Sequence, residues 1–144
     1  MDVLIVEDDV LVAEVLVEAL GRKGLEAYAV TTLEDAESER ALLRAGGTIV
    51  IDIDLRGADA FGWFERTASL HPYPSHRYIL VSSDRLDPLQ GSWLEAARGT
   101  FLRKPFPPRQ LAAAIRGGND GRRGGGVGGP RRRTPPDLGG PETV

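Results

Sequence analysis

The chain contains no cysteine and only two histidines among its 144 residues. The absence of cysteine excludes disulfide bonds, thiolate metal sites and cysteine nucleophiles, and two histidines cannot form a three-histidine metal site. No apolar run approaches the roughly 20 residues that a membrane-spanning helix needs, and no basic-then-apolar leader opens the chain. Eighteen basic against 21 acidic residues give a net charge of −3, which indicates no general attraction to nucleic acid. We therefore expect a cytoplasmic protein without membrane insertion or direct contact with nucleic acid.

The composition changes sharply near the C-terminal end. Residues 117–144 hold ten glycines and four prolines, and their five arginines and three acids leave the first 116 residues with a net charge of −5. Only three aliphatic side chains occur in this stretch, too few to offset the entropy lost when the segment is ordered. The sequence predicts one domain over residues 1–116 and a disordered, Gly/Pro/Arg-rich C-terminal tail over residues 117–144.

Short apolar runs alternate with helical segments over residues 1–116. The predicted strands are Val3–Val6, Leu25–Val30, Thr48–Ile53, Tyr78–Ser82 and Thr100–Arg103. The predicted helices are a segment that ends near Gly21–Gly24, then Leu33–Ala45, Ala60–Leu70, a less regular stretch over Asp84–Ala97, and Pro108–Arg116. The buried face of the first helix is predicted from the spacing of Val12, Val15, Leu16, Ala19 and Leu20. Five such strand–helix units predict an α/β fold with a doubly wound, five-stranded parallel sheet.

Polar side chains stand at or just after the ends of four of the predicted strands. In chain order they are Glu7, Asp8 and Asp9, then Asp52 and Asp54, then Ser82 and Ser83, then Lys104. Asp9 fits the N-cap of the first helix better than a ligand position. In doubly wound sheets the ligand crevice lies at the carboxyl ends of the strands. We therefore expect the other side chains to converge on one edge of the sheet.

A cluster of carboxylates at this edge requires counter-charge. If Glu7, Asp8 and Asp52 lie ~5 Å apart, each pair repels by roughly 3 kcal/mol at an effective dielectric near 20. A hard divalent cation with oxygen ligands would relieve this repulsion, and Mg²⁺ is the best candidate. Lys104 supplies a second positive charge. A carboxylate beside a metal ion, a lysine and a hydroxyl is suited to receive a phosphoryl group. Asp52 is the predicted acceptor because it ends the middle strand in chain order.

Four motifs together resemble a response-regulator receiver domain over residues 1–116. They are Val3-Leu4-Ile5-Val6-Glu7-Asp8-Asp9, Asp52-Ile53-Asp54-Leu55-Arg56-Gly57, Leu80-Val81-Ser82-Ser83 and Phe101-Leu102-Arg103-Lys104-Pro105-Phe106. The resemblance implies a flavodoxin-like (βα)5 fold with strand order 2-1-3-4-5. It also implies that Asp52 accepts a phosphoryl group from a phosphohistidine on a sensor histidine kinase or a histidine phosphotransfer protein.

Further roles follow from the same resemblance. Asp8 and Asp52 would bind Mg²⁺ (or Mn²⁺) directly, Glu7 would act through water, and the backbone carbonyl of Asp54 would complete the protein ligands. Ser82 matches the family's switch hydroxyl, Lys104 its lysine and Phe101 its aromatic switch position. Lys104-Pro105 matches its usual cis peptide. We expect a phosphoacceptor with slow self-dephosphorylation rather than an enzyme.

The chain departs from the family pattern at several positions. Arg56 replaces the usual proline, Ala58-Asp59-Ala60-Phe61 replaces the usual glycine-containing turn, and Ser82 replaces the commoner threonine. Asp54 places an extra negative charge near the phosphoryl position, and we expect it to alter the rate of dephosphorylation. The irregular segment Asp84–Ala97 and the short last helix predict that the surface through which the family signals after phosphorylation is unusual in this chain.

Two alternative functions stay open from the sequence. The Asp52-Ile53-Asp54 run is similar to the D-x-D motif of haloacid-dehalogenase-type phosphatases, although Leu55-Arg56 follows it and the expected late acidic pair is missing. The chain is also compatible with a degenerate receiver that serves purely as an interaction module. Because no further domain is expected after residue 116, the predicted output is docking to a downstream target protein, or phosphoryl relay.

Overall fold

The computed structural model describes residues 1–117 and 143–144 of the chain. The strands are β1 (Val3–Val6), β2 (Ala27–Val30), β3 (Gly47–Asp52), β4 (His76–Ser82) and β5 (Thr100–Arg103). The helices are α1 (Val10–Arg22), α2 (Leu33–Arg40), α3 (Ala60–Leu70) and α4 (Pro88–Ala96), and a last helix begins at residue 108 and continues through residue 117. The five strands form one parallel sheet in the order β2-β1-β3-β4-β5. The predicted fold class and strand order are confirmed.

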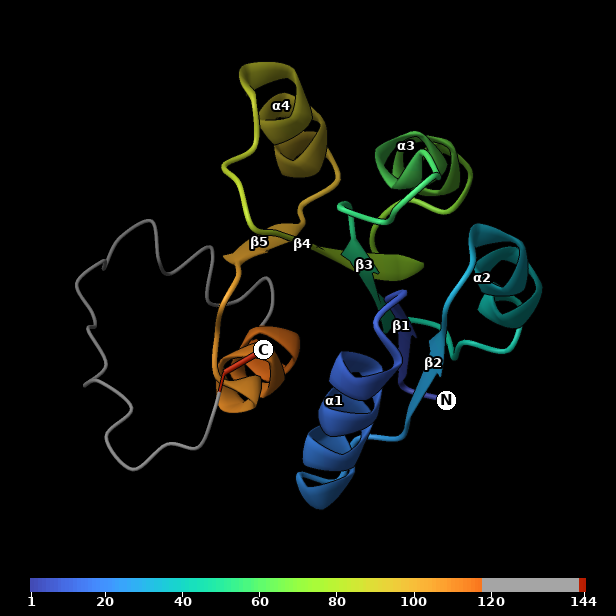
Figure 1. Ribbon diagram of the computed structural model, residues 1–144. Coiled ribbons are helices and arrows are strands. Elements are labelled where there is room, and N and C mark those ends of the chain that lie inside the picture. The colour runs from blue at the N-terminus through green and yellow to red at the C-terminus, as the bar shows by residue number, and fades with distance from the viewer. Residues whose placement is uncertain (118–142) are drawn as a thin grey trace.

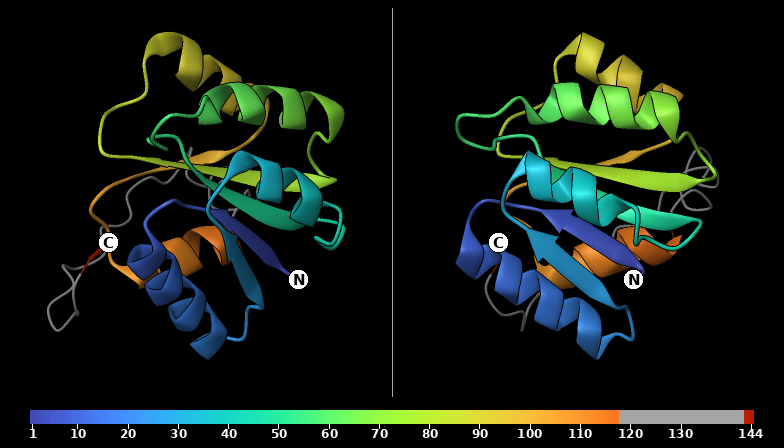
Figure 2. Two further views of the ribbon diagram at one scale, coloured as in Figure 1. Left: turned by 45° about the vertical axis from the view of Figure 1, so that its right-hand side comes forward. Right: turned by 90° about the vertical axis from the view of Figure 1, so that its right-hand side faces the viewer.

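The helices cover both faces of this sheet (Figure 1). One face packs against α2, α3 and α4, in a cluster that includes Ala36, Phe64 and Leu94. The other face packs against α1 and the last helix, through Leu16 and Leu111 among others. The turned views in Figure 2 show the same three layers, with the sheet between the helices. Because the central strands β1 and β3 are covered on both sides, every one of their residues is buried, as expected of apolar runs in a parallel sheet.

The first two helices differ from their predicted form. The structure places Ala13, Leu16 and Leu20 on the buried face of α1, whereas Val15 is 39% exposed, so its predicted place in the core is wrong. Helix α2 ends at Arg40 rather than Ala45. The backbone amide of Arg44 donates to the carbonyl of Met1 at 3.0 Å instead of continuing the helical ladder. A tertiary contact with the start of the chain therefore draws this segment away from α2.

Helix α4 is shorter and better defined than the sequence indicated. Asp87 caps it, accepting from the Gln90 amide at 2.7 Å, while the Gln90 side chain accepts from the Asp87 amide at 3.0 Å. Pro88 occupies the first helical turn, where its missing N–H costs no hydrogen bond. Pro88 thus lies directly after the N-cap of a capping box formed by Asp87 and Gln90, which fixes where the helix begins.

Most of the predicted tail, residues 118–142, lies outside the described residues. At its end, Val144 exchanges two backbone hydrogen bonds of 2.8 Å with Phe106 and packs against the cluster on the α1 side of the sheet. Within the described residues, each helix is too short or too polar to cross a membrane.

We predict that Tyr78→Phe lowers the free energy of unfolding by about 1–3 kcal/mol. The Tyr78 side chain is 1% exposed, and its hydroxyl donates to the carbonyls of His71 at 2.7 Å and Thr67 at 3.3 Å, which ties β4 to the end of α3. Without the hydroxyl, both carbonyls lose this donor. Urea unfolding measures the effect, and Tyr28→Phe is the matched control because Tyr28 is 50% exposed. Equal losses in the two variants would contradict the prediction.

Candidate functional site

The strand register brings the acidic side chains of β1 and β3 together. Val6 pairs with Ile51, so Glu7 and Asp52 lie side by side at the carboxyl ends of neighbouring strands. Carboxylate oxygens of Glu7, Asp8 and Asp52 all lie within 4.8 Å of one another. Glu7 and Asp52 are each 3% exposed, and Asp8 lies at the rim. The convergence expected from the sequence is present.

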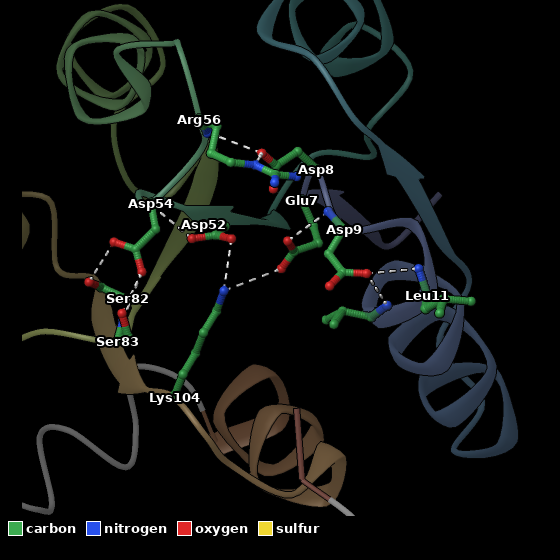
Figure 3. Close-up of polar contacts among 11 residues, drawn as sticks. Glu7, Asp8, Asp9, Leu11, Asp52, Asp54, Arg56, Ser82, Ser83 and Lys104 are labelled. Atoms are coloured by element: carbon green, nitrogen blue, oxygen red, sulfur yellow. Dashed lines mark hydrogen bonds and ion pairs between the residues drawn. The ribbon is translucent and has the colours of Figure 1, made fainter.

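Lys104 lies between the two buried carboxylates (Figure 3). Its Nζ is 2.9 Å from Asp52 Oδ2 and 3.7 Å from Glu7 Oε1. Burial, with a further contribution from the nearby Asp52 carboxylate, raises the pKa of Glu7 to about 7. Burial opposes the charged form of Lys104, but the hydrogen bond to Asp52 and the surrounding carboxylates raise the pKa of Lys104 above its ordinary value. The lysine is therefore a fixed counter-charge for the cluster.

A second cation, which the sequence did not assign to the site, contacts Asp8. Asp8 Oδ2 accepts from the Arg56 backbone amide at 3.0 Å and from Arg56 Nε at 3.3 Å. The hydrogen bond from the Arg56 amide, aided by the guanidinium, holds the pKa of Asp8 below its ordinary value although partial burial opposes this. Arg56 was noted only as a departure from the family's proline. Proline has neither the amide donor nor the guanidinium. The replacement of proline by arginine was therefore the sequence feature that could have indicated a new contact with the acidic cluster.

The hydroxyls at the end of β4 turn toward Asp54 rather than Asp52. Ser82 Oγ donates to Asp54 Oδ1 at 2.9 Å, and both the amide and the hydroxyl of Ser83 donate to Asp54 Oδ2, at 2.8 and 3.1 Å. Burial alone would raise the pKa of Asp54, but the hydrogen bonds from Ser83 and Ser82 lower it below the ordinary value. The Asp54 backbone amide donates to Asp52 Oδ1 at 2.8 Å. Ser83, to which no role was assigned, is thus a direct partner of Asp54.

The remaining predicted positions are placed as follows. The Lys104–Pro105 peptide is cis, as the resemblance implied. Phe101 is partly buried against the α2–α3–α4 side of the core, opposite Leu80 in the sheet. Its switch role stays a prediction. Asp9 is the N-cap of α1 and not part of the acidic cluster, because its Oδ1 accepts from the Leu11 and Val12 amides.

A small pocket of about 10 Å³ lies beneath the acidic cluster. Glu7, Asp52 and Lys104 line it together with apolar side chains of α1 and the sheet, and with Phe106 and Val144. Glu7, Asp52 and Lys104 therefore lie at the edge of the core, where charges interact more strongly than in bulk solvent.

Comparison with known proteins assigns the family. The model of the response regulator receiver domain matches residues 3–116, and the chain belongs to this family. Members are phosphoacceptor signalling domains of two-component systems; they are phosphorylated on an aspartate, bind Mg²⁺ through acidic residues and interact with histidine kinases and downstream effectors. The alternative of a haloacid-dehalogenase-type phosphatase is thereby wrong.

Individual relatives agree with this assignment. The chain is 28% identical over 116 residues to the transcriptional regulatory protein CreB of Escherichia coli, covering 79% of this chain and 48% of that protein. It is 34% identical over 119 residues to the transcriptional regulatory protein BasR of Escherichia coli, covering 81% of this chain and 51% of that protein. The chain thus spans about half the length of the curated relatives it matches.

A solved structure shares the fold. The CheY-like receiver domain protein from Methanospirillum hungatei aligns with a TM-score of 0.69 at 20% identity, covering 84% of this chain and 94% of that one.

We predict that Asp9→Ala lowers the free energy of unfolding by about 1 kcal/mol, because the first amides of α1 lose their side-chain acceptor. Asp9→Asn keeps an acceptor oxygen and is expected to be nearly neutral. The Asp9 backbone amide, which donates to Glu7 Oε2 at 3.0 Å, is present in both variants. Chemical unfolding compares the three proteins. If Asp9→Asn is as destabilised as Asp9→Ala, the charge and not the cap stabilises the helix.

Proposed function

We propose that Asp52 is the phosphoacceptor of this chain and receives its phosphoryl group from a phosphohistidine of a sensor histidine kinase or a histidine phosphotransfer protein. The observation that carries the proposal is the contact of the Lys104 ammonium with Asp52 inside a cluster of three carboxylates. Burying several carboxylates together costs stability, and such clusters occur preferentially at functional sites.

The transfer needs few groups from the protein. An Asp52 oxygen attacks phosphorus, the new O–P bond forms, and the N–P bond of the donor breaks with its electron pair remaining on the imidazole nitrogen. Lys104 Nζ lies 2.9 Å from Asp52 Oδ2, so its ammonium can neutralise negative charge on the oxygens of the phosphoryl group. The Asp54 amide holds Asp52 Oδ1 in place, and the Ser82 hydroxyl lies on the adjoining strand.

The carboxylates of this edge fit a hard divalent cation, Mg²⁺ or Mn²⁺. Asp8 and Asp52 would hold the ion directly, Glu7 through water, and the backbone carbonyl of Asp54 would complete the protein ligands. Their oxygen donors and their separation, within 4.8 Å for the three carboxylates, suit such an ion. When bound, the ion supplies charge neutralisation for the transferred phosphoryl group.

The output available to the described residues is docking. Every described helix and strand belongs to the receiver fold, so we propose that phosphorylation changes the affinity of this part of the chain for a downstream protein, or passes the phosphoryl group on by relay. We further propose a cytoplasmic protein with slow self-dephosphorylation and no direct contact with nucleic acid. Ser82 and Phe101 would transmit the change, and residues 117–144 would act as an extension of the domain at residues 1–116.

The rival proposal is a degenerate receiver that acts by binding alone. One observation argues against it: the acidic cluster, the lysine and a β4 hydroxyl are all present and lie together. A chain that no longer accepts phosphate has no use for this electrostatic arrangement.

We predict that incubation with acetyl phosphate and Mg²⁺ adds one phosphoryl group to the wild-type protein and none to Asp52→Asn. Intact-mass measurement detects the gain. Asp35→Asn, at an exposed position on α2, is the matched control and should be labelled like the wild type. Labelling of Asp52→Asn would refute Asp52 as the acceptor and point to another acceptor residue. No labelling of either protein would also refute it and would favour the degenerate receiver.

We also predict that Arg56→Ala binds Mg²⁺ a few-fold more tightly than the wild type. Arg56 competes with the ion for Asp8, but its side chain is 83% exposed and solvent screens the contact, so the gain is small. Calorimetric titration at low and high salt measures the effect, which should shrink as salt rises. Arg66→Ala, on the exposed side of α3, controls for loss of one positive charge. Unchanged or weaker binding by Arg56→Ala would contradict the prediction.

A further inference from the structure

Asp54 carries more hydrogen bonds than its exposed position requires. Three donors at the end of β4 converge on its carboxylate: the Ser82 hydroxyl at 2.9 Å, the Ser83 amide at 2.8 Å and the Ser83 hydroxyl at 3.1 Å. Figure 3 shows this side chain turned toward the two serines and away from Glu7 and Asp8. Asp54 is thus an anion held by a ready-made set of donors.

The same donors lie where a phosphoryl group on Asp52 would need them. Asp52 pairs with Val81 across the sheet, so Ser82 is the next residue along β4. The Ser82 carbonyl accepts from the Lys104 amide at 2.8 Å, and the Lys104 ammonium contacts Asp52, so both groups border one small region. A phosphoryl group adds three oxygens to the Asp52 carboxylate, and each of them needs a donor or a cation.

We propose that Asp54 is a positioning residue that competes with the phosphoryl group on Asp52 for the donors of Ser82 and Ser83. The inference rests on Asp52 being the acceptor. In the unphosphorylated protein the Asp54 carboxylate occupies these donors and holds the end of β4 in its resting arrangement. Phosphorylation displaces it, and the freed carboxylate turns into solvent, which its exposed position allows. Asp54 therefore sets how tightly the site holds a phosphoryl group.

Charge strengthens the competition. The edge carries four carboxylates, those of Glu7, Asp8, Asp52 and Asp54. Lys104 contacts Glu7 and Asp52, and Arg56 contacts Asp8. A phosphoryl group adds a further negative charge beside Asp54, so the two anions repel as well as share donors. Hydrogen bonding and repulsion act in the same direction, but only the first of them depends on the serine hydroxyl.

Beryllium trifluoride tests the proposal without covalent phosphate. The carboxylate oxygen of Asp52 displaces the water ligand of the beryllium, and three fluorides then take the places of the three phosphoryl oxygens. We expect Asp54→Ala to bind this probe, in the presence of Mg²⁺, about tenfold more tightly than the wild type, as the release of a charge-assisted hydrogen bond would give. Titration followed by ¹⁹F NMR measures the affinity. Asp84→Ala is the matched control, because it removes a nearby charge and keeps the backbone amide that donates to Ser82 Oγ.

A double-mutant cycle separates competition for the hydroxyl from repulsion. If Asp54 acts through Ser82, the gain from Asp54→Ala shrinks in a Ser82→Ala background. An equal gain in both backgrounds, a similar gain in Asp84→Ala, or unchanged or weaker binding by Asp54→Ala would each overturn the proposal. Urea unfolding of every variant shows that the fold is retained.

The same titrations distinguish failure of the proposed function, with Asp52 as acceptor, from failure of the competition by Asp54. If the wild type and Asp54→Ala both bind the probe and Asp52→Asn does not, Asp52 is the acceptor, and the ratio of the two affinities decides the role of Asp54. If Asp52→Asn binds like the wild type, or if neither the wild type nor Asp54→Ala binds, both the acceptor and its competitor are refuted.

Discussion

The ion pair between Lys104 and Asp52 is the interaction on which the site depends. Glu7 and Asp52 are almost fully buried beside one another, and two ionised carboxylates in such a place repel strongly. The lysine ammonium, within reach of both, offsets this repulsion and is itself kept charged by them. Because these three groups come from the ends of β1, β3 and β5, the counter-charge is in place only when the parallel sheet is formed.

The acids around this pair have partners of their own. Asp8 is held by the Arg56 amide and guanidinium, and Asp54 by Ser82 and Ser83 at the end of β4. In the resting site each of these acids therefore has a hydrogen-bond or ion-pair partner within the chain. A metal ion or a phosphoryl group would replace some of these internal contacts when it binds. Its affinity would therefore reflect the free energy of the new contacts minus that of the contacts it displaces. Arg56 and Asp54, two of the departures from the family pattern, each take part in these internal contacts.

Particular elements show how far sequence reasoning reaches. The strands were predicted well because β1 is wholly apolar and β3 carries the apolar run Ile49–Ile51, as expected of strands covered on both faces. The end of α2 and the exposure of Val15 were predicted wrongly. Both depend on what lies across the fold: the Met1 carbonyl draws Arg44 from the helix, and the rotation of α1 against the sheet decides which of its valines face solvent. Periodicity alone does not contain that information.

The sequence by itself determined the fold class, the edge of the sheet at which the acids gather and most of the groups that converge there, Arg56 excepted. Local patterns suffice for this, because the carboxyl ends of parallel strands meet at one edge whatever the connecting loops do. Only the tertiary structure decided the pairing within that edge. A hydroxyl such as that of Ser82 can donate to either Asp52 or Asp54, and the choice depends on register, loop path and distances of a few tenths of an ångström. These are set by packing across the whole domain, which spacing along the chain does not encode.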